Sequence, residues 1–218
     1  MLLKKCFILI VNFFLKRTNK EIYAEHAALQ WREIPYFGQM FPDGKIIHLY
    51  RDPRGVLASW KKFHQTPDMH YLNCIFNWID SINYLERYSK SFTPDKYFLL
   101  KYEDLQKDPE LWINKICNFI GISFEKEMLE PEKWTDILGA IGSELVSIPQ
   151  SAHEGKNIVG YSNKRPTYWM KSLDLWEVAL VEFLAKDKLD MLGYECFEKS
   201  YDMDVIRRGI TELQKNPL

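Results

Sequence analysis

Two arginines and a serine follow a short apolar segment, in a pattern that can bind an anion. Residues 45–60 read KIIHLYRDPRGVLASW, and Ser59 lies eight residues after Arg51. A guanidinium offers a planar pair of donors to phosphate oxygens. Asp52 and Pro53 are typical of a helix start, where free backbone N–H groups favour anions. The spacing alone leaves a second interpretation open, in which Arg51 pairs with a carboxylate and Ser59 is only a small packing residue.

The surrounding elements predict where this pattern lies. The order of strand, helix, strand and helix, with unbroken apolar strands, is typical of a parallel sheet covered on both faces. We therefore expect an α/β fold with Arg51 at the carboxyl edge of the sheet, where open α/β proteins bind ligands. The expected elements are strands over 45–50 and 96–102 and helices over 24–41 (broken at Pro35), 53–64, 70–88, 108–121 and 173–192, with an irregular region over 131–168.

The N-terminal segment is apolar in its middle and basic at its ends. Its apolar run from Cys6 to Leu15 is too short to span a bilayer, and no small-residue cleavage site follows. We interpret residues 1–20 as a buried helix or strand, or a truncated start, and expect a cytoplasmic rather than a membrane-anchored protein. The expected division is this segment, one domain over 21–200, and a helical tail over 201–218.

Composition excludes several classes of protein. The chain has 218 residues, 46% of them hydrophobic, and a net charge of −1, so no basic field argues for nucleic acid. Its four cysteines form no CxxC pair, which argues against a zinc knuckle or a dense disulfide framework. We expect free thiols in the core and no metal site. The oligomeric state is not indicated.

Four segments resemble the sulfotransferases that use 3′-phosphoadenosine 5′-phosphosulfate (PAPS). IIHLYRDPRGVLASW is similar to their 3′-phosphate motif, a strand followed by R-[DN]-P-[RK]-x-x-x-x-S. FPDGKIIHL is similar to the segment that leads into that motif. The other two are similar to the second strand with its Tyr-Glu-Asp-Leu turn, and to the closing loop and last helix: KYFLLKYEDLQKDPELWINKICNFIGI and RPTYWMKSLDLWEVALVEFLAKDKLDMLGYE.

The resemblance implies a fold like that of the P-loop NTPases and a set of donor-binding residues. Arg51 and Ser59 occupy the positions that contact the 3′-phosphate in this family. Tyr102 corresponds to a tyrosine near the nucleotide, and Arg165 lies in the segment that closes over it. Glu103 and Asp104 are interpreted as turn and cap residues, and His48 as a core histidine with satisfied hydrogen bonds. No metal is expected in sulfuryl transfer of this kind.

One expected element has no counterpart in the sequence. The family's glycine-containing loop for the 5′-phosphosulfate is not found upstream of Arg51, so we expect the first strand, loop and helix to be absent from this chain. The catalytic base is correspondingly open. Glu21 and His26 keep the spacing of a family Glu-Lys-Thr-Pro-x-His segment, but its Lys-Thr-Pro core is absent. Both residues are candidates, alongside an ordinary surface role.

Two functions therefore remain open. The first is transfer of a sulfuryl group from PAPS to a hydroxyl or amine of a carbohydrate, peptide tyrosine, lipid or small molecule. The second is a truncated, inactive sulfotransferase-like protein that binds nucleotide or keeps only the fold. A nucleotide kinase is a distant third, because no GxxxxGK[ST] segment occurs.

Overall fold

A short parallel sheet lies at the centre of the fold. The computed structural model describes residues 2–26, 29–63, 69–130, 161, 166–196 and 202–215. Within this part of the chain, β1 (Ile46–Tyr50) pairs with β2 (Tyr97–Lys101) in parallel register, Ile46 opposite Tyr97. Both strands and the α/β class were predicted from the sequence and are confirmed.

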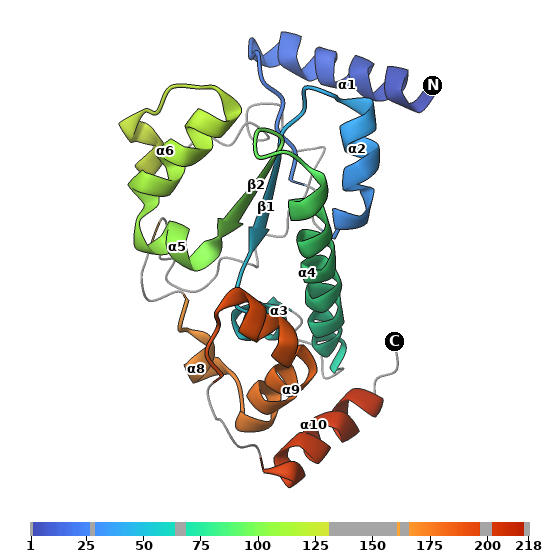
Figure 1. Ribbon diagram of the computed structural model, residues 1–218, viewed down its shortest axis with the longest axis vertical. Coiled ribbons are helices and arrows are strands. Elements are labelled where there is room, and N and C mark those ends of the chain that lie inside the picture. The colour runs from blue at the N-terminus through green and yellow to red at the C-terminus, as the bar shows by residue number, and fades with distance from the viewer. Residues whose placement is uncertain are drawn as a thin grey trace.

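Helices surround the sheet and extend beyond its carboxyl ends (Figure 1). Helix α4 lies along one side of the strands and α6 along the other, while α3, α8, α9 and α10 gather beyond the ends of the arrows. The helices are α1 (Leu2–Thr18), α2 (Ile34–Met40), α3 (Pro53–Phe63), α4 (Cys74–Ser91), α5 (Tyr102–Lys107), α6 (Pro109–Ile120), α8 (Trp169–Ser172), α9 (Leu175–Leu192) and α10 (Met203–Gln214), with short 3-10 turns at Trp31–Glu33, Met69–Asn73 and Lys126–Leu129.

Several helices begin or end at the residues that the local sequence predicts. Asp108 caps α6 by accepting a hydrogen bond from the Leu111 N–H at 3.1 Å, and Pro109 follows it. Gly121 and Gly193 end α6 and α9 with φ of 85° and 71°, in the left-handed region that glycine tolerates.

The helix expected over residues 24–41 is wrong in its first half. The described residues 21–26 are irregular, Leu29 has a positive φ of 61°, and regular structure begins at Trp31. Pro35 stands in the first turn of α2 rather than in a helix interior. Proline has no N–H to donate to a preceding turn, so it starts this helix instead of kinking a longer one.

The main core joins α3, α4, α9 and α10. Leu57, Leu72 and Leu180 are fully buried within it. A Cβ added to Gly209 of α10 would lie 3.0 Å from the Cβ of Leu180, so glycine permits close packing of α10 on α9. Cys74 and Cys117 are buried free thiols. Among the described residues no cluster of metal-ligating side chains occurs.

The prediction that the sheet is covered on both faces is only half right. His48 of β1 is buried, and its ring nitrogens contact the Tyr97 hydroxyl at 2.5 Å and the Ser81 hydroxyl at 3.1 Å, as a satisfied core histidine does. On the opposite face of β1, Ile47 and Leu49 remain 39% and 52% exposed. The helices of the described part of the chain cover that face at β2 but leave it open at β1.

The N-terminal segment is a helix, but it is not buried. Leu9 and Phe13 of α1 are 69% and 58% exposed, whereas Phe7 packs against Phe41 at a ring distance of 5.4 Å. No helix in the described part of the chain is both long and apolar enough to cross a membrane. The irregular region predicted over residues 131–168 lies almost entirely outside the described residues.

Candidate functional site

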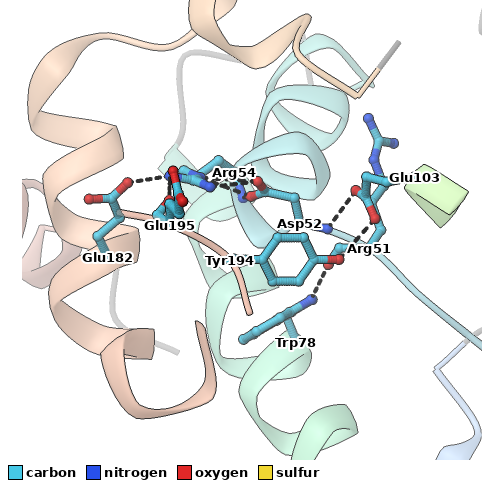
Figure 2. Close-up of polar contacts among 8 residues, drawn as sticks. All are labelled: Arg51, Asp52, Arg54, Trp78, Glu103, Glu182, Tyr194 and Glu195. Carbon is cyan, nitrogen blue, oxygen red and sulfur yellow. Dashed lines mark hydrogen bonds and ion pairs between the residues drawn. The ribbon is translucent and has the colours of Figure 1, made fainter. Parts of the chain in front are cut away.

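The strand-to-helix junction at Arg51 and Asp52 is the centre of the candidate site (Figure 2). Asp52 is buried, and its Oδ1 accepts the Arg54 backbone N–H at 2.9 Å, which caps α3 as the sequence predicts. On the other side, the Trp78 indole of α4 donates to the Arg51 carbonyl at 2.8 Å. The backbone is thus held from two elements where β1 turns into α3.

Glu103 ties this junction to the neighbouring strand and to the chain after α9. Its Oε1 accepts the Asp52 N–H at 3.0 Å, and its Oε2 accepts the Tyr194 hydroxyl at 2.9 Å. Burial, with the negative charge of Glu103, raises the pKa of Tyr194, so its hydroxyl stays a donor. The interpretation of Glu103 as a simple turn and cap residue was therefore wrong, because its carboxylate bridges three segments.

Arg54, the second arginine of the motif, points into the protein. It is 4% exposed, and its guanidinium donates to both carboxylate oxygens of Asp52, to Glu182 Oε1 at 2.5 Å and to the Glu195 carbonyl at 2.9 Å. Burial acts to lower the pKa of Arg54, but the hydrogen bonds and charges of Asp52 and Glu182 leave it raised. Arg54 therefore holds α3 to α9 and is not available to a ligand.

Arg51 is arranged in the opposite way. Its guanidinium carbon lies 4.6 Å from the centre of the Tyr102 ring, and its Nε is buried without a hydrogen-bond partner among the described residues. Within the same residues no carboxylate forms an ion pair with it. The second interpretation of the sequence, in which Arg51 pairs with a carboxylate, expected such a pair. Arg51 instead keeps unused donors at the carboxyl edge of the sheet.

Gly55 permits this position of Arg51. A Cβ added at residue 55 would lie 2.9 Å from Arg51 Nε and 3.0 Å from its Nη2, so the guanidinium rests on the first turn of α3. Ser59 is four residues further along the helix and therefore on the same face. Ser59 is exposed. Arg51, Tyr102 and Ser59 thus come from three places in the chain to one side of the junction.

Helix α3 is also fixed at its far side by a buried carboxylate. Glu177 of α9 is fully buried and accepts hydrogen bonds from Lys61 Nζ at 2.6 Å, from the Asp174 N–H at 2.7 Å and from the Tyr71 hydroxyl. Burial and the charge of Glu177 raise the pKa of Tyr71. The face of α3 that carries Gly55 and Ser59 is thereby held in one orientation.

The remaining predicted site residues are not brought to this junction by any described contact. Glu21 and His26 are exposed on the irregular segment after α1. Tyr23, between them, packs against Phe7 of α1 at a ring distance of 6.2 Å. Arg165 lies outside the described residues. The two candidate bases and Arg165 stay predictions.

Sequence reasoning missed Gly55 and the roles of Glu103 and Tyr194. Gly55 has a signal, because glycine in the first turn of a helix next to an anion-binding motif suggests close approach. The contacts of Glu103 have no local signal, since its partner Tyr194 is 91 residues away in the chain.

The fold and the junction together define an α/β protein that presents an arginine and a helix N-terminus at the carboxyl ends of parallel strands. A sequence model of the Sulfotransferase family matches residues 8–126, more than half of the chain. The chain belongs to this family.

Curated relatives agree with this assignment, and a solved structure shares the fold. Human sulfotransferase 2A1 is 29% identical over 126 residues, which cover 51% of this chain and 42% of that protein. The protein-tyrosine sulfotransferase of Drosophila melanogaster is 24% identical over 103 residues, 45% of this chain and 21% of that protein. The sulfotransferase domain of the Synechococcus PCC 7002 olefin synthase has a TM-score of 0.55 at 22% identity, covering 80% of this chain and 62% of that one. The chain spans less than half the length of both curated relatives.

Proposed function

We propose that this chain binds PAPS through the nucleotide 3′-phosphate and acts as a sulfotransferase. The observation that carries the proposal is the state of Arg51, whose Nε is buried without a partner among the described residues while its guanidinium lies over Tyr102. A buried donor without a partner costs free energy, commonly about 1–3 kcal/mol. A phosphate oxygen at this place would remove that cost.

The three residues of the site then take separate roles. The Arg51 guanidinium donates to the 3′-phosphate, and the N-terminal turn of α3 adds its favourable dipole. Ser59, on the face of α3 that carries Gly55, donates its hydroxyl to the same group. Tyr102 holds the guanidinium by a cation–π contact and borders the nucleotide. Arg165 is proposed as a further contact from the closing segment.

The reaction proposed is an in-line transfer. The acceptor oxygen or nitrogen forms a bond to sulfur as the bond between sulfur and the 5′-phosphate oxygen breaks, which leaves 3′-phosphoadenosine 5′-phosphate. A base must take the acceptor proton, and Glu21 and His26 are the proposed candidates. The acceptor class is a hydroxyl or amine of a peptide tyrosine, carbohydrate, lipid or small molecule. Relatives with matching segments are described as protein-tyrosine and omega-hydroxy-beta-dihydromenaquinone-9 sulfotransferases.

A second function is supported by the chain's first 37 residues, which contain no glycine. A loop whose backbone N–H groups surround the 5′-phosphosulfate commonly needs glycine. The alternative proposal is therefore that these 218 residues by themselves bind the nucleotide without transferring the sulfuryl group.

The test is calorimetric titration of the 218-residue chain with 3′-phosphoadenosine 5′-phosphate. Replacing Arg51→Ala removes a charged, bidentate contact worth about 1.5–3 kcal/mol, so affinity should fall at least about tenfold. Arg87→Ala is the matched control, because Arg87 also lies over a tyrosine ring, that of Tyr84 at 5.0 Å. Equal binding by the parent and the Arg51 variant contradicts the proposed site. Transfer of labelled sulfate from PAPS to a phenol then separates the two functions.

A further inference from the structure

Helix α1 presents an apolar surface that no part of the described chain covers. We call Leu9, Ile10 and Phe13 the α1 ridge; these side chains are 69%, 52% and 58% exposed. The other side of the helix is attached, since Phe7 contacts the rings of Phe41 and Tyr23. The α1 ridge is thus exposed on a helix that is attached through Phe7. In Figure 1, helix α1 lies far from α9 and α10.

The charged residues of the α1 segment itself all have one sign, and the first acidic residue, Glu21, comes after it. Residues 1–20 contain five cations and no acidic residue, although the whole chain has a net charge of −1. Lys5, Leu9, Phe13 and Lys16 follow one another at helical spacing, so cations border the ridge at both ends. Lys5, Lys16, Arg17 and Lys20 are exposed, and none forms an ion pair with a carboxylate of the described residues.

We propose that α1 docks on an anionic lipid surface, lying in the plane of the interface with the α1 ridge among the acyl chains. Exposed Phe and Leu bordered by Lys and Arg are the features of helices that bind in this way. Anionic headgroups supply the negative charge that the helix lacks. This proposal does not depend on the proposed sulfotransferase function.

Two other ways of covering the ridge fit less well. A membrane span requires about 20 apolar residues, whereas the run between Lys5 and Lys16 of α1 has ten residues, one of them Asn12. Pairing of two copies through the ridge would bring two groups of cations together without any carboxylate from residues 1–20 between them. Like charges that are brought close together repel.

The experiment is co-sedimentation of the full chain with phosphatidylcholine vesicles, with and without phosphatidylserine. The chain should bind the phosphatidylserine vesicles and release as salt is raised, and should bind the neutral vesicles weakly. The double variant Lys16→Glu/Arg17→Glu should lower the affinity at least about tenfold. Leu9→Glu/Phe13→Glu should abolish binding, since a charge replaces each inserted side chain.

A control variant and a check of folding accompany the vesicle experiment. Met203→Glu is the control, because Met203 is a similarly exposed apolar residue (56%) on α10 and should bind as the parent does. Thermal melting checks that each variant is folded. The substituted side chains are exposed, so we expect the substitutions to leave the core intact. The proposal is overturned if phosphatidylserine makes no difference, if Met203→Glu lowers binding as much as the ridge variant, or if light scattering shows a dimer that Phe13→Glu dissociates.

Discussion

Replacing Gly55 by alanine should raise stability and lower nucleotide affinity at the same time. Gly55 has ordinary helical backbone, and it is not among the described residues with positive φ. The three atoms that lie nearest to an added Cβ, at 2.9–3.2 Å, are Nε, Nη2 and Cζ of the Arg51 side chain. Because a guanidinium ends a flexible side chain, Arg51 can swing away while α3 stays intact.

The two effects have separate physical origins and magnitudes. Alanine is favoured over glycine in a helix by up to about 1 kcal/mol, which corresponds to a rise in Tm of about 2–4 °C in a protein of this size. Displacement of Arg51 from Tyr102 removes the proposed phosphate contact, worth about 1.5–3 kcal/mol, or about ten- to a hundredfold in Kd. A variant that merely disturbs the fold would lower both the Tm and the nucleotide affinity. A rise in Tm together with a fall in affinity therefore distinguishes the proposed effect from general destabilisation.

The assays are thermal denaturation and calorimetric titration with 3′-phosphoadenosine 5′-phosphate. Gly38→Ala serves as the control, because its added Cβ meets only the Phe92 ring, at 3.3 Å, and should leave the affinity unchanged. If Gly55 acts through Arg51, Gly55→Ala has no further effect on affinity in an Arg51→Ala background. Unchanged affinity of Gly55→Ala in the parent would refute the inference that Arg51 binds the anion from this position.

Two more predictions concern buried residues, Arg54 beside the site and His48 in the core. Arg54→Ala should lower the free energy of unfolding by about 3–5 kcal/mol in urea titrations, because it removes the buried cation that Asp52 and Glu182 both contact. The exposed Arg207→Ala should change it by less than about 1 kcal/mol, and equal effects would contradict this. Burial lowers the pKa of His48 to about 4 from 6.5. As the pH falls, the unfolded chain therefore protonates this histidine before the folded chain does. Stability should therefore decline as pH falls from about 6.5 to about 4, by up to about 1.4 kcal/mol per pH unit, and His48→Gln should decline less.

The sequence by itself determined the features that depend on neighbours along the chain. Asp52 with Pro53, and Asp108 with Pro109, marked helix starts because a carboxylate and a missing N–H suit the first turn whatever surrounds it. Gly193 marked an end for the same local reason. The apolar runs of β1 and β2, separated by the helices α3 and α4, were enough to predict parallel pairing.

The resemblance selected Arg51 from the sequence, but only the tertiary structure shows what keeps Arg54 from the same role. Arg51 and Arg54 are three residues apart and alike in local sequence, but Arg54 is drawn inward by Glu182 and the Glu195 carbonyl, 128 and 141 residues further along the chain. Glu103 acquired its role in the same way, through Tyr194. A buried charge lies where partners from distant segments can satisfy it, and local spacing carries no record of those partners. Among the described residues Arg51 Nε has no such partner, and this is the basis for proposing Arg51 as the anion-binding residue.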